Sequence, residues 1–588
     1  MKHLLALLAT AIFLPLTVCG AGSGNSSTSS FGGASLASKF SFPAQDDNGW
    51  SILKPSKDSR LIYVSNSGND GTALTYSPSS KEIGRDPFNP SGTVRPYATI
   101  DAALAQARAN YPDYILLKRG DTWANNTYIR LKAGRSAAER SVLGYYGGAS
   151  GRPTVLHNGV NFSWASYSAV IGIRFYASRR DPGSKDFVGF TNVGMARGFD
   201  GVLGYGGRIA GGILIEDCWF DWFSGNALQS PKADHEPLHD IIVRRNIITN
   251  SYSTQSHAQG LYTSRVSLWL EENIFDHNGW YKQGAGNVKT DGAATMFNHN
   301  TYFTDTHETV FRNNLFLRGS SAANKFTSNT KSGKNEIKVW DLVVDNNLYI
   351  EGEVGISIGG NDDQNNGPRW RNIHVTNNVM QHIGRTQPTL RTLGWGLDAQ
   401  DWDSGKVSGN IFANWGDGAR LRNNYAINVV GDTTNVSVTD NIIYNVSSAK
   451  PLVQFLGGSP QSGTEFSGND VWTNDSGPLM AHSLTGNARF GNNYFHSAAN
   501  KSQWFTVNGA TASLDNYRVA ARDTTSVAGK RRYVAAERTI ETYLTSIGLA
   551  KDMNSFVAEL CTQSKFHWVP ALGANAINSY FRGGFATL

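Results

Sequence analysis

A phrase built around asparagine recurs through the middle of the chain. Each copy has an apolar residue three positions before an Asn and, in nearly every case, two apolar residues directly after it. The central residues are Asn246, Asn273, Asn314, Asn347, Asn378, Asn410, Asn441, Asn469 and Asn493, with Cys218 in the same slot of an earlier copy. Neighbouring copies lie 24 to 41 residues apart. A period of this length is typical of solenoids and propellers.

A parallel β-helix explains the spacing better than a propeller does. A propeller blade needs four strands in about 40–45 residues, whereas most of these units are shorter and vary by insertion. Coils of three short strands would stack at about 4.8 Å, which places one position of every coil in a column. A buried Asn column can pass its amide hydrogen bonds from coil to coil, so the Asn phrases are interpreted as scaffold. The 62 glycines agree with many tight bends.

One further copy of the phrase does not fit the period. Asn300 lies 27 residues after Asn273 but only 14 residues before Asn314. A full coil cannot be made from so few residues, so either Asn300 or Asn314 must lie off the main column.

The two ends of the chain follow other patterns. A strand at 61–65 is followed by a helix that begins near Thr99, and from about residue 498 apolar residues recur at helical spacing. The opening YVS…GNDG…PYATIDAAL…ILLKRGDTW, with the Asn-centred coils after it, resembles the secreted right-handed parallel β-helix proteins of the pectate-lyase-like superfamily.

The resemblance covers about residues 60–497 and implies an all-β, right-handed parallel β-helix. The open first coil of such a solenoid must be covered, and the helix near Thr99 can cover it. We expect the helical segment after residue 498 to pack on the last coil. Its stretch FVAELCTQSKFHWVPALGANAINSYFRGGF resembles the tail of bacterial β-helix proteins associated with polysaccharide processing.

The N-terminus has the features of an export signal. Its apolar run at 4–18 is too short to span a membrane and is typical of a signal sequence. The run ends at Cys19, which resembles a bacterial lipoprotein signal with a lipidated cysteine; an ordinary secretory signal is the alternative. The predicted organisation is therefore a signal peptide at 1–19, a flexible tether at 20–60, a capped β-helix at 61–497 and a C-terminal helical cap at 498–588. The predicted location is secreted, periplasmic or anchored to the outer membrane of a bacterium.

Composition narrows the possible partners. Charged residues make up 17% of the 588 residues, and the formal net charge is +6, which is compatible with an acidic polymer as substrate. No Lys/Arg run indicates nucleic-acid binding, and three cysteines without a CxxC pair argue against a disulfide framework or a zinc site. We expect a monomer without a bound cofactor, although the Gly-rich loop at 361–363 could hold Ca²⁺.

Side chains capable of acid–base chemistry gather between residues 257 and 325. Aligning 260–264 with 287–291 points Tyr262 and Lys289 outward, one coil apart. Gln259 would share that face only if the strand bends near Gly260. The predicted catalytic residues are His257, Tyr262, Lys289, His299 and Arg312. The predicted substrate-binding residues are Gln259, Asp291, Tyr302, His307, Lys325 and Trp395.

These residue types suit β-elimination on a uronate polymer. A cation, Lys289 or Arg312, would neutralise the carboxylate and acidify the C5 proton. His257 or Lys289 would remove that proton, and Tyr262 would protonate the leaving oxygen. The sequence therefore favours a polysaccharide lyase acting on an acidic polysaccharide.

Three other functions stay open. A C5-epimerase would share the proton abstraction, and a non-enzymatic surface protein would only bind the glycan. A glycoside hydrolase would need two facing carboxylates. The possible pairs are Asp291 with Glu308 and Asp398 with Asp401.

Overall fold

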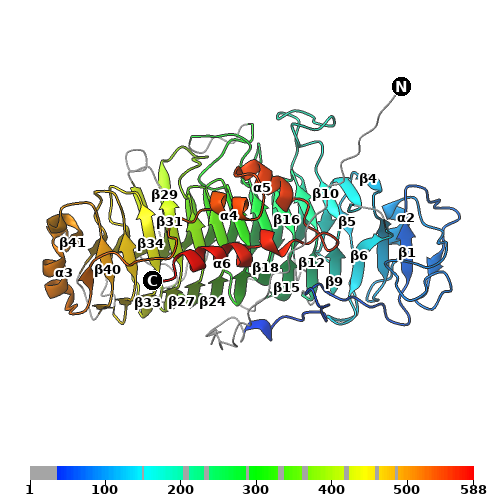
Figure 1. Cartoon of the computed structure of the whole chain (residues 1–588). Helices are drawn as coiled ribbons and strands as arrows, with labels where there is room; N and C mark the ends of the chain where they lie inside the picture. The colour runs from blue at the N-terminus through cyan, green and yellow to red at the C-terminus, as the bar shows by residue number, and fades with distance from the viewer. Residues whose placement is uncertain are drawn as a thin grey trace, which may run out of the picture.

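The chain winds into a solenoid of three long β-sheets (Figure 1). This computed structural model describes residues 36–148, 151–202, 211–230, 238–285, 291–328, 337–359, 369–415, 423–456, 462–483 and 488–588. Successive strands enter the three sheets in rotation, and nearly all neighbours pair in parallel; antiparallel pairs occur at the two ends, between β1 and β2 and between β41 and β42. The predicted right-handed parallel β-helix is confirmed.

The first sheet, sheet 1, contains 15 strands within the described ranges. In spatial order they are β2 (Thr75–Tyr76), β1 (Leu61–Val64), β3 (Tyr114–Lys118), β6 (Ser141–Tyr146), β9 (Ser168–Ile171), β12 (Ile213–Glu216), β15 (Leu238–Arg244), β18 (Val266–Glu271), β21 (Thr309–Arg312), β24 (Ile337–Asp345), β27 (Arg369–Thr376), β30 (Gly405–Ser408), β33 (Val436–Thr439), β36 (Glu465–Ser467) and β39 (Arg489–Gly491).

Sheet 2 follows sheet 1 in each coil and contains 14 strands in the described chain. They are β4 (Thr122–Asn125), β7 (Thr154–His157), β10 (Arg174–Tyr176), β13 (Trp219–Asp221), β16 (Ile247–Thr249), β19 (Ile274–Asp276), β22 (Leu315–Leu317), β25 (Leu348–Ile350), β28 (Val379–Gln381), β31 (Ile411–Trp415), β34 (Ile442–Val446), β37 (Asp470–Trp472), β40 (Tyr494–His496) and β43 (Val527–Ala528).

Sheet 3 completes each coil, again with 14 strands among the described residues. They are β5 (Ile129–Arg130), β8 (Val160–Asn161), β11 (Arg197–Val202), β14 (Gly225–Gln229), β17 (Gln259–Ser264), β20 (His299–Thr304), β23 (Ala322–Thr327), β26 (Val354–Ile358), β29 (Leu393–Gln400), β32 (Asn423–Val430), β35 (Val453–Leu456), β38 (Met480–His482), β41 (Phe505–Val507) and β42 (Ala510–Ala512).

The Asn phrases form a continuous hydrogen-bonded ladder at the corner between sheets 1 and 2. Asn314 is representative: its backbone N–H and its Nδ2 both donate to Oδ1 of Asn347 in the next coil, at 2.9 Å each. The same Nδ2 donates to the Leu270 carbonyl of the preceding coil at 2.9 Å. Each Asn therefore joins three coils and leaves none of its side-chain groups unsatisfied.

The ladder has defined ends. It begins where the Cys218 N–H donates to Asn246 Oδ1 at 2.9 Å, and it ends where Ser526 Oγ accepts from the Asn493 N–H at 2.9 Å. Asn300 lies instead in β20 of sheet 3, and it donates to the Leu317 carbonyl at 3.2 Å. Asn314 thus belongs to the main column and Asn300 does not.

The corner turns are tight because the residue before each ladder Asn has a left-handed backbone. The φ values at these positions lie between 53° and 70°. Glycine fills only two of the nine, at 409 and 468; the others are Arg245, Glu272, Asn313, Asn346, Asn377, Asp440 and Asn492. Asn and Asp tolerate this conformation at modest cost. The high glycine content is therefore not what makes this corner.

Helix α2 (Ile100–Gln106) covers the first coil. Its buried Ile100 and Ala103 join the central core with Ile62 and Ile115. At the other end, α3 (Leu514–Ala521) covers the last coil, where the Tyr517 ring stacks on Phe505 at 4.4 Å between centroids. The short helix η2 (Lys501–Gln503) lies just before β41.

After β43, which pairs with β40, the C-terminal segment does not pack on the last coil, contrary to the sequence expectation. Three α-helices return along the outer face of sheet 2 (red in Figure 1): α4 (Ile540–Ser546), α5 (Met553–Leu560) and α6 (Ala574–Gly584), with η3 (Pro570–Leu572) before α6. Outward residues of sheet 2 such as Ile274 and Leu315 are apolar and form one core with these helices. Burying this apolar stripe explains the position of the helices.

The described part of the segment before β1, residues 36–60, covers sheet 1 and is called the N-terminal arm below. Leu36 and Phe40 are buried against outward residues of sheet 1. Phe40 and Phe42 contact the Trp269 ring edge-on, at 5.7 and 5.2 Å between centroids. These residues, assigned above to a flexible tether, are part of the folded body. The predicted signal peptide at 1–19, with Cys19, lies outside the described residues.

The ladder should contribute strongly to stability. Asn347→Ala would leave the backbone N–H and one Nδ2 hydrogen of Asn314, together with the Phe311 carbonyl, without these partners. Asn378 Oδ1 would lose one of its two bonds and keep the Asn347 N–H. Unsatisfied buried groups cost about 1–3 kcal/mol each. We expect a loss of about 3–5 kcal/mol in the free energy of unfolding, measured by urea denaturation.

Asn474→Ala is the matched control. Asn474 is exposed, and its hydrogen bond to Asn445 Oδ1 is long at 3.4 Å. This change should cost less than about 0.5 kcal/mol. Equal effects of the two changes would show that the ladder does not carry the stability assigned to it.

Candidate functional site

A column of polar and aromatic side chains runs along the outer face of sheet 3. Six positions pair in register on consecutive strands, so their side chains are about 4.8 Å apart along the solenoid. The members, called the tyrosine–lysine column, are Tyr262, Tyr302, Lys325, Ser357, Asp398 and Asn428. Their neighbours in the strands, such as Leu261 and Phe303, are fully buried in the core, so alternation points the column outward.

This face differs from the other two. Sheets 1 and 2 carry apolar outward stripes that the arm and the C-terminal helices bury. On sheet 3 the apolar cluster contains only Ala322, Val354 and Leu393, with Trp395 beside them, and no described residue of the arm or of α4 to α6 joins it. Among the described residues, the outer face of sheet 3 is therefore the one whose apolar cluster is not covered by the arm or by α4 to α6.

The alignment that paired Tyr262 with Lys289 is corrected by the strand register. Tyr262 pairs with Tyr302 in the next coil, and Lys289 lies outside the described residues. The coil between Asn273 and Asn314 has 41 residues, and its sheet 3 strand is β20. Aligning 260–264 with 287–291 assumes a coil of 27 residues, and residues 287–291 come before β20 in the sequence.

Two tyrosines and a buried histidine form the first part of the site. The Tyr302 ring lies 5.6 Å from the Tyr262 ring and 5.4 Å from the His299 ring. Thr327 Oγ1 donates to the Tyr302 hydroxyl at 3.2 Å. His299 Nδ1 accepts the Ala322 N–H at 3.2 Å, so a neutral His299 carries its proton on Nε2.

The charge state of His299 is set by its surroundings. Burial holds the pKa of His299 well below its usual value, and the nearby cations Lys325 and Arg391 lower this pKa further, as does His257. The ring is therefore uncharged at neutral pH and presents an N–H donor. It is suited to binding an anionic oxygen rather than to supplying a positive charge.

Gln259 and His257 lie at the start of the same strand. β17 contains one extra residue relative to β14, because Gly225 pairs with Gln259 while Ala227 pairs with Tyr262. This bulge is the bend that the sequence required near Gly260. Gln259 Nε2 donates to the Phe297 carbonyl at 2.9 Å, and the exposed His257 ring lies 5.1 Å from the Phe297 ring.

Lys325 is the basic member of the column. Its Nζ donates to Ser357 Oγ at 3.0 Å and to the Gly359 carbonyl at 3.2 Å. Burial lowers the pKa of Lys325, and the negative charge of Asp398 opposes that shift. An uncharged amine has two hydrogens and one lone pair. The two acceptors bind the two hydrogens and leave the lone pair available.

Asp398 extends the network by one coil. Its Oδ1 accepts from Asn428 Nδ2 at 2.8 Å and from the Tyr425 hydroxyl at 3.3 Å, and its Oδ2 accepts from Ser357 Oγ at 3.4 Å. Ser357 therefore connects Lys325 with Asp398. The Tyr425 ring also stacks on Trp395 at 5.0 Å between centroids, which gives the column an aromatic neighbour.

A buried ion pair lies beside the column. Glu353 is fully buried and accepts from the Thr389 N–H at 2.6 Å and from Arg391 Nη2 at 2.9 Å. Arg391 Nη2 also donates to Ser321 Oγ at 2.6 Å, while about 29% of its side chain remains exposed. Arg391 is thus a fixed cation near His299.

Three predicted residues lie away from the column. Arg312 is exposed at the end of β21 in sheet 1. His307 is buried in the turn before β21, where its ring stacks on Trp340 at 4.3 Å. Asp291 is a partly exposed residue of the loop before β20, with its Oδ2 3.1 Å from Lys282 Nζ.

Neither suggested hydrolase pair faces across the column. Asp398 lies in the column, but Asp401 lies in the turn after β29, where its Oδ1 accepts the Asp432 N–H at 2.8 Å. Glu308 forms an ion pair with Lys39 of the arm, whereas Asp291 pairs with Lys282. Ser357, Glu353 and Arg391 are residues of this region that the sequence pattern does not indicate. Sheet 3 has no repeated phrase that would have revealed their register.

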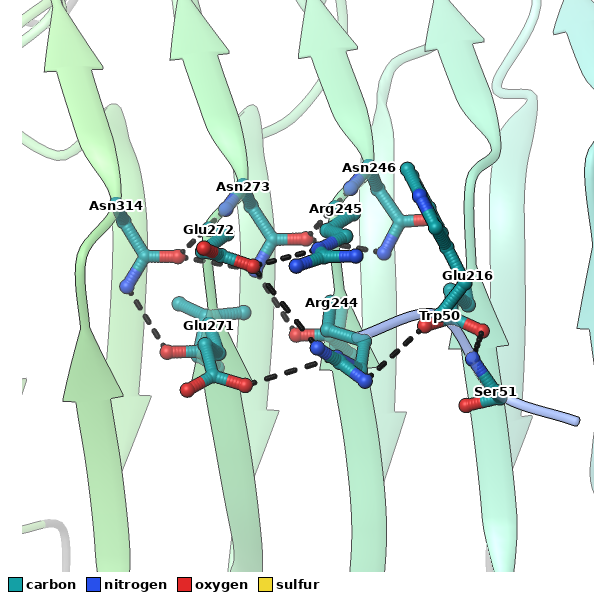
Figure 2. A network of polar contacts seen from close by, with 12 residues as sticks. Trp50, Ser51, Glu216, Arg244, Arg245, Asn246, Glu271, Glu272, Asn273 and Asn314 are labelled. Carbon is teal, nitrogen blue, oxygen red and sulfur yellow. Dashed lines mark hydrogen bonds and ion pairs between the residues drawn. The ribbon is translucent and has the colours of Figure 1, made fainter. Parts of the chain in front are cut away.

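A second charged cluster lies at the corner of sheets 1 and 2 (Figure 2). Arg244 is almost fully buried and lies 3.2 Å from Glu216 Oε1 and 3.6 Å from Glu271 Oε2. The Ser51 N–H of the arm donates to Glu216 Oε2 at 3.2 Å. This cluster ties the arm to the coils.

Arg245 joins both ends of the chain at this corner. Its guanidinium lies 4.4 Å from the Trp50 ring centroid and 5.1 Å from that of Trp568, and its Nη1 donates to the Asn48 carbonyl at 2.9 Å. Its Nε lies 2.6 Å from Glu272 Oε2. Because Arg244 and Arg245 both have carboxylates within ion-pair distance, the cluster is interpreted as a structural clasp and not as a reaction site.

A single substitution in the clasp should lower the free energy of unfolding more than a matched double substitution does. Arg244→Met leaves Glu216 buried without its cation and should cost about 3–5 kcal/mol in the free energy of unfolding. Arg244→Met combined with Glu216→Gln should cost clearly less, because Glu216, the most deeply buried carboxylate of the cluster, then no longer carries an unpaired charge. Urea denaturation measures both effects.

An exposed ion pair provides the comparison. Arg371 pairs with Asp403 at 3.0 Å, and both side chains are substantially exposed. Arg371→Met should change stability by less than about 1 kcal/mol. If Arg244→Met cost no more than this control, the clasp would not hold the arm.

The described residues contain no group of three or more His, Cys, Asp or Glu side chains that could hold a metal ion. The calcium prediction at 361–363 lies outside the described residues. Cys218 and Cys561 are free thiols. In the described ranges, no helix has the length and apolar character needed to cross a membrane.

Comparisons with known proteins give only distant similarities. No family model and no curated protein matches the chain. Among solved structures it is similar to a mannuronic acid specific polysaccharide family 6 lyase from human gut microbiota, with 12% identity, a TM-score of 0.36 and coverage of 80% of this chain and 94% of that one.

Two other solved structures have comparable scores. The Yersinia enterocolitica family 28 exopolygalacturonase is 10% identical, with a TM-score of 0.36 and 82% of each chain covered. The Streptococcus pneumoniae surface protein and adhesin PfbA is 11% identical, with a TM-score of 0.36, 69% of this chain and 94% of that chain covered. Similarities at this level carry no argument about function, which must be argued from the residues.

Proposed function

We propose that the protein acts on an acidic polysaccharide and cleaves it by β-elimination, as a polysaccharide lyase, at the tyrosine–lysine column. The observation that carries this proposal is Lys325: a half-buried amine in an outward column, with a lowered pKa and both hydrogens of its neutral form bound. A polymer lying along sheet 3 would place one of its sugar residues next to this amine.

In this proposal Lys325 is the base. β-Elimination begins with removal of the C5 proton next to the uronate carboxylate, which requires a base that is unprotonated near neutral pH; for a lysine this is the uncharged amine. The lowered pKa increases the uncharged fraction of the amine, and Ser357 and Gly359 hold its lone pair in a fixed direction. The electrons of the C5–H bond form the C4–C5 double bond as the bond from C4 to the glycosidic oxygen breaks.

Tyr302 is the proposed acid. It neighbours Lys325 in the column and carries a hydroxyl already oriented by Thr327. Protonation of the leaving oxygen by this hydroxyl would complete the elimination. The His299 Nε2–H and the Arg391 guanidinium are the proposed partners of the uronate carboxylate, whose negative charge increases as the C5 proton leaves.

The positions of Lys325 and Tyr302 on one face of the sheet favour elimination over epimerisation and hydrolysis. Base and acid are neighbours on one face of one sheet, so both reach the substrate from the same side. An epimerase must return a proton to C5 from the opposite side. A hydrolase needs a second carboxylate, and Asp398 is the one carboxylate among column residues 262 to 428.

Activity should depend on Lys325 and Tyr302. With a panel of acidic polysaccharides, the wild-type protein should generate unsaturated ends, followed by their ultraviolet absorbance. Lys325→Met and Tyr302→Phe should each lower kcat by about 10²–10⁴-fold. Lys325→Arg should not restore activity, because arginine does not lose its proton in proteins.

Lys406→Met is the matched control, since Lys406 lies on β30 in sheet 1, away from the column. It should retain wild-type activity. Reducing ends without absorbance would indicate hydrolysis, and polymer binding without any change in the polymer would indicate a binding protein. Full activity of both Lys325→Met and Tyr302→Phe would place the reaction elsewhere.

The pH profile should respond to Asp398. As the base, Lys325 must be deprotonated, so kcat/KM should rise with pH through its lowered pKa. The charge of Asp398 raises that pKa, and Asp398→Asn removes the charge. The acidic limb of the profile should therefore move to lower pH. A shift to higher pH, or none, would contradict the assignment of Lys325 as base.

A further inference from the structure

A second candidate site lies on the first coils, away from the column. It is a pocket of about 850 Å³ between residues 51–55 of the arm, the loop at 78–89 and residues 565–566 of the C-terminal segment. Its volume falls within the range of small-molecule sites, about 300–1,000 Å³. It shares no residue with the column, which begins several coils later at β17.

The pocket carries an excess of positive charge. Among its described lining residues, four cations face one carboxylate, Asp86: Lys54, Arg85, Arg119 and Lys565. Asp86 Oδ1 is occupied by the Phe88 N–H at 2.9 Å. Lys565 has a distant ion pair, 3.8 Å from Asp46 Oδ2.

Arg119 is the best placed of these cations. Its Nε donates to the Gly151 carbonyl at 3.3 Å, and its guanidinium lies 3.9 Å from the centroid of the Phe566 ring. Burial lowers the pKa of Arg119, as expected for a cation that lacks a close counter-ion. No described carboxylate forms an ion pair with Arg119 or Arg85, so both can bind an external anion.

Aromatic rings form the adjoining wall. The Tyr145 ring lies 5.3 Å from the Phe566 ring and 5.7 Å from the Phe88 ring. Phe566 is 55% exposed although it is large and apolar. An exposed aromatic face beside guanidinium groups that pair with no described carboxylate suits a ring-shaped ligand that carries an acid group, and sugars commonly use such faces for their C–H surface.

The walls are held in place by contacts outside the pocket. The Lys565 N–H donates to Asp217 Oδ1 at 3.1 Å. Arg152 Nη2 donates to the same oxygen at 2.6 Å and to the Gln563 carbonyl at 2.7 Å. On the opposite side, the clasp holds Ser51 through Glu216. The two chain ends thus form a preorganised site, which lowers the ordering cost of binding.

We propose that this pocket binds one anionic sugar residue, a uronate of the polymer, as an anchoring site separate from the reaction. The sugar ring would lie against Phe566, and its carboxylate would bind Arg119 and Arg85. The inference rests on the proposed function only for the choice of uronate as the anionic sugar. An anchor at one end of the solenoid would retain the polymer between cleavages.

Calorimetric titration with short oligouronates tests the proposal in the full-length Lys325→Met protein, which would not consume the ligand. Arg119→Gln and Phe566→Ala, each added to that background, should weaken binding at one site about tenfold or more. Arg532→Gln, which changes an exposed arginine outside the pocket, should have no effect. Neutral oligosaccharides of equal length should bind at least tenfold more weakly.

Two results would overturn the proposal. The first is unchanged affinity and stoichiometry in both pocket variants, with the same unfolding midpoint as the background protein. The second is inorganic phosphate binding as tightly as the oligouronate, with no effect of Phe566→Ala, which would define a plain anion site. Pocket-dependent binding in a protein that generates no unsaturated ends would support this inference while the proposed reaction fails.

Discussion

The Asn ladder is the constraint on which the rest of the structure depends. Each ladder residue bonds to the coil before it and the coil after it, as Asn314 does with the Leu270 carbonyl and Asn347. A coil cannot slip against its neighbours without breaking these bonds, whatever length its loops have. This fixed register lets residues from coils of very different size, such as Tyr302 and Lys325, lie side by side.

The outward positions then decide which face remains open. Alternation places Ile274 and Leu315 outside sheet 2, and Trp269 and Val310 outside sheet 1. Exposing these apolar stripes to water would be unfavourable, so the N-terminal arm covers the stripe of sheet 1 and helices α4 to α6 cover that of sheet 2. Sheet 3 has half-buried tyrosine, lysine and aspartate at the corresponding positions. The covering segments and the open face are therefore two consequences of one pattern.

The sequence predicts the scaffold well and the site only in part, and the reason is physical. The phrase around each ladder Asn marks the corner of sheets 1 and 2, so the coils can be aligned there. Sheet 3 lies at the other side of each coil, after insertions of variable length, and Tyr262 was aligned with Lys289 instead of Tyr302. The two apolar residues after each Asn did carry a further signal: the first of them, such as Ile274, points outward and required a cover.

Arg244 and Lys325 show how one scaffold can hold cations for opposite purposes. Arg244 has Glu216 and Glu271 within ion-pair distance, so its charge is balanced and it fixes the arm. Lys325 is bound by the uncharged oxygens of Ser357 and Gly359, which hold its hydrogens without stabilising its charge as a carboxylate would. Asp398 is held one coil further away, near enough to raise the pKa of Lys325 but not to pair with it. The strand spacing of the solenoid thus sets how strongly a carboxylate neutralises each cation. Because Asp398 does not pair with Lys325, Lys325 loses its proton more easily.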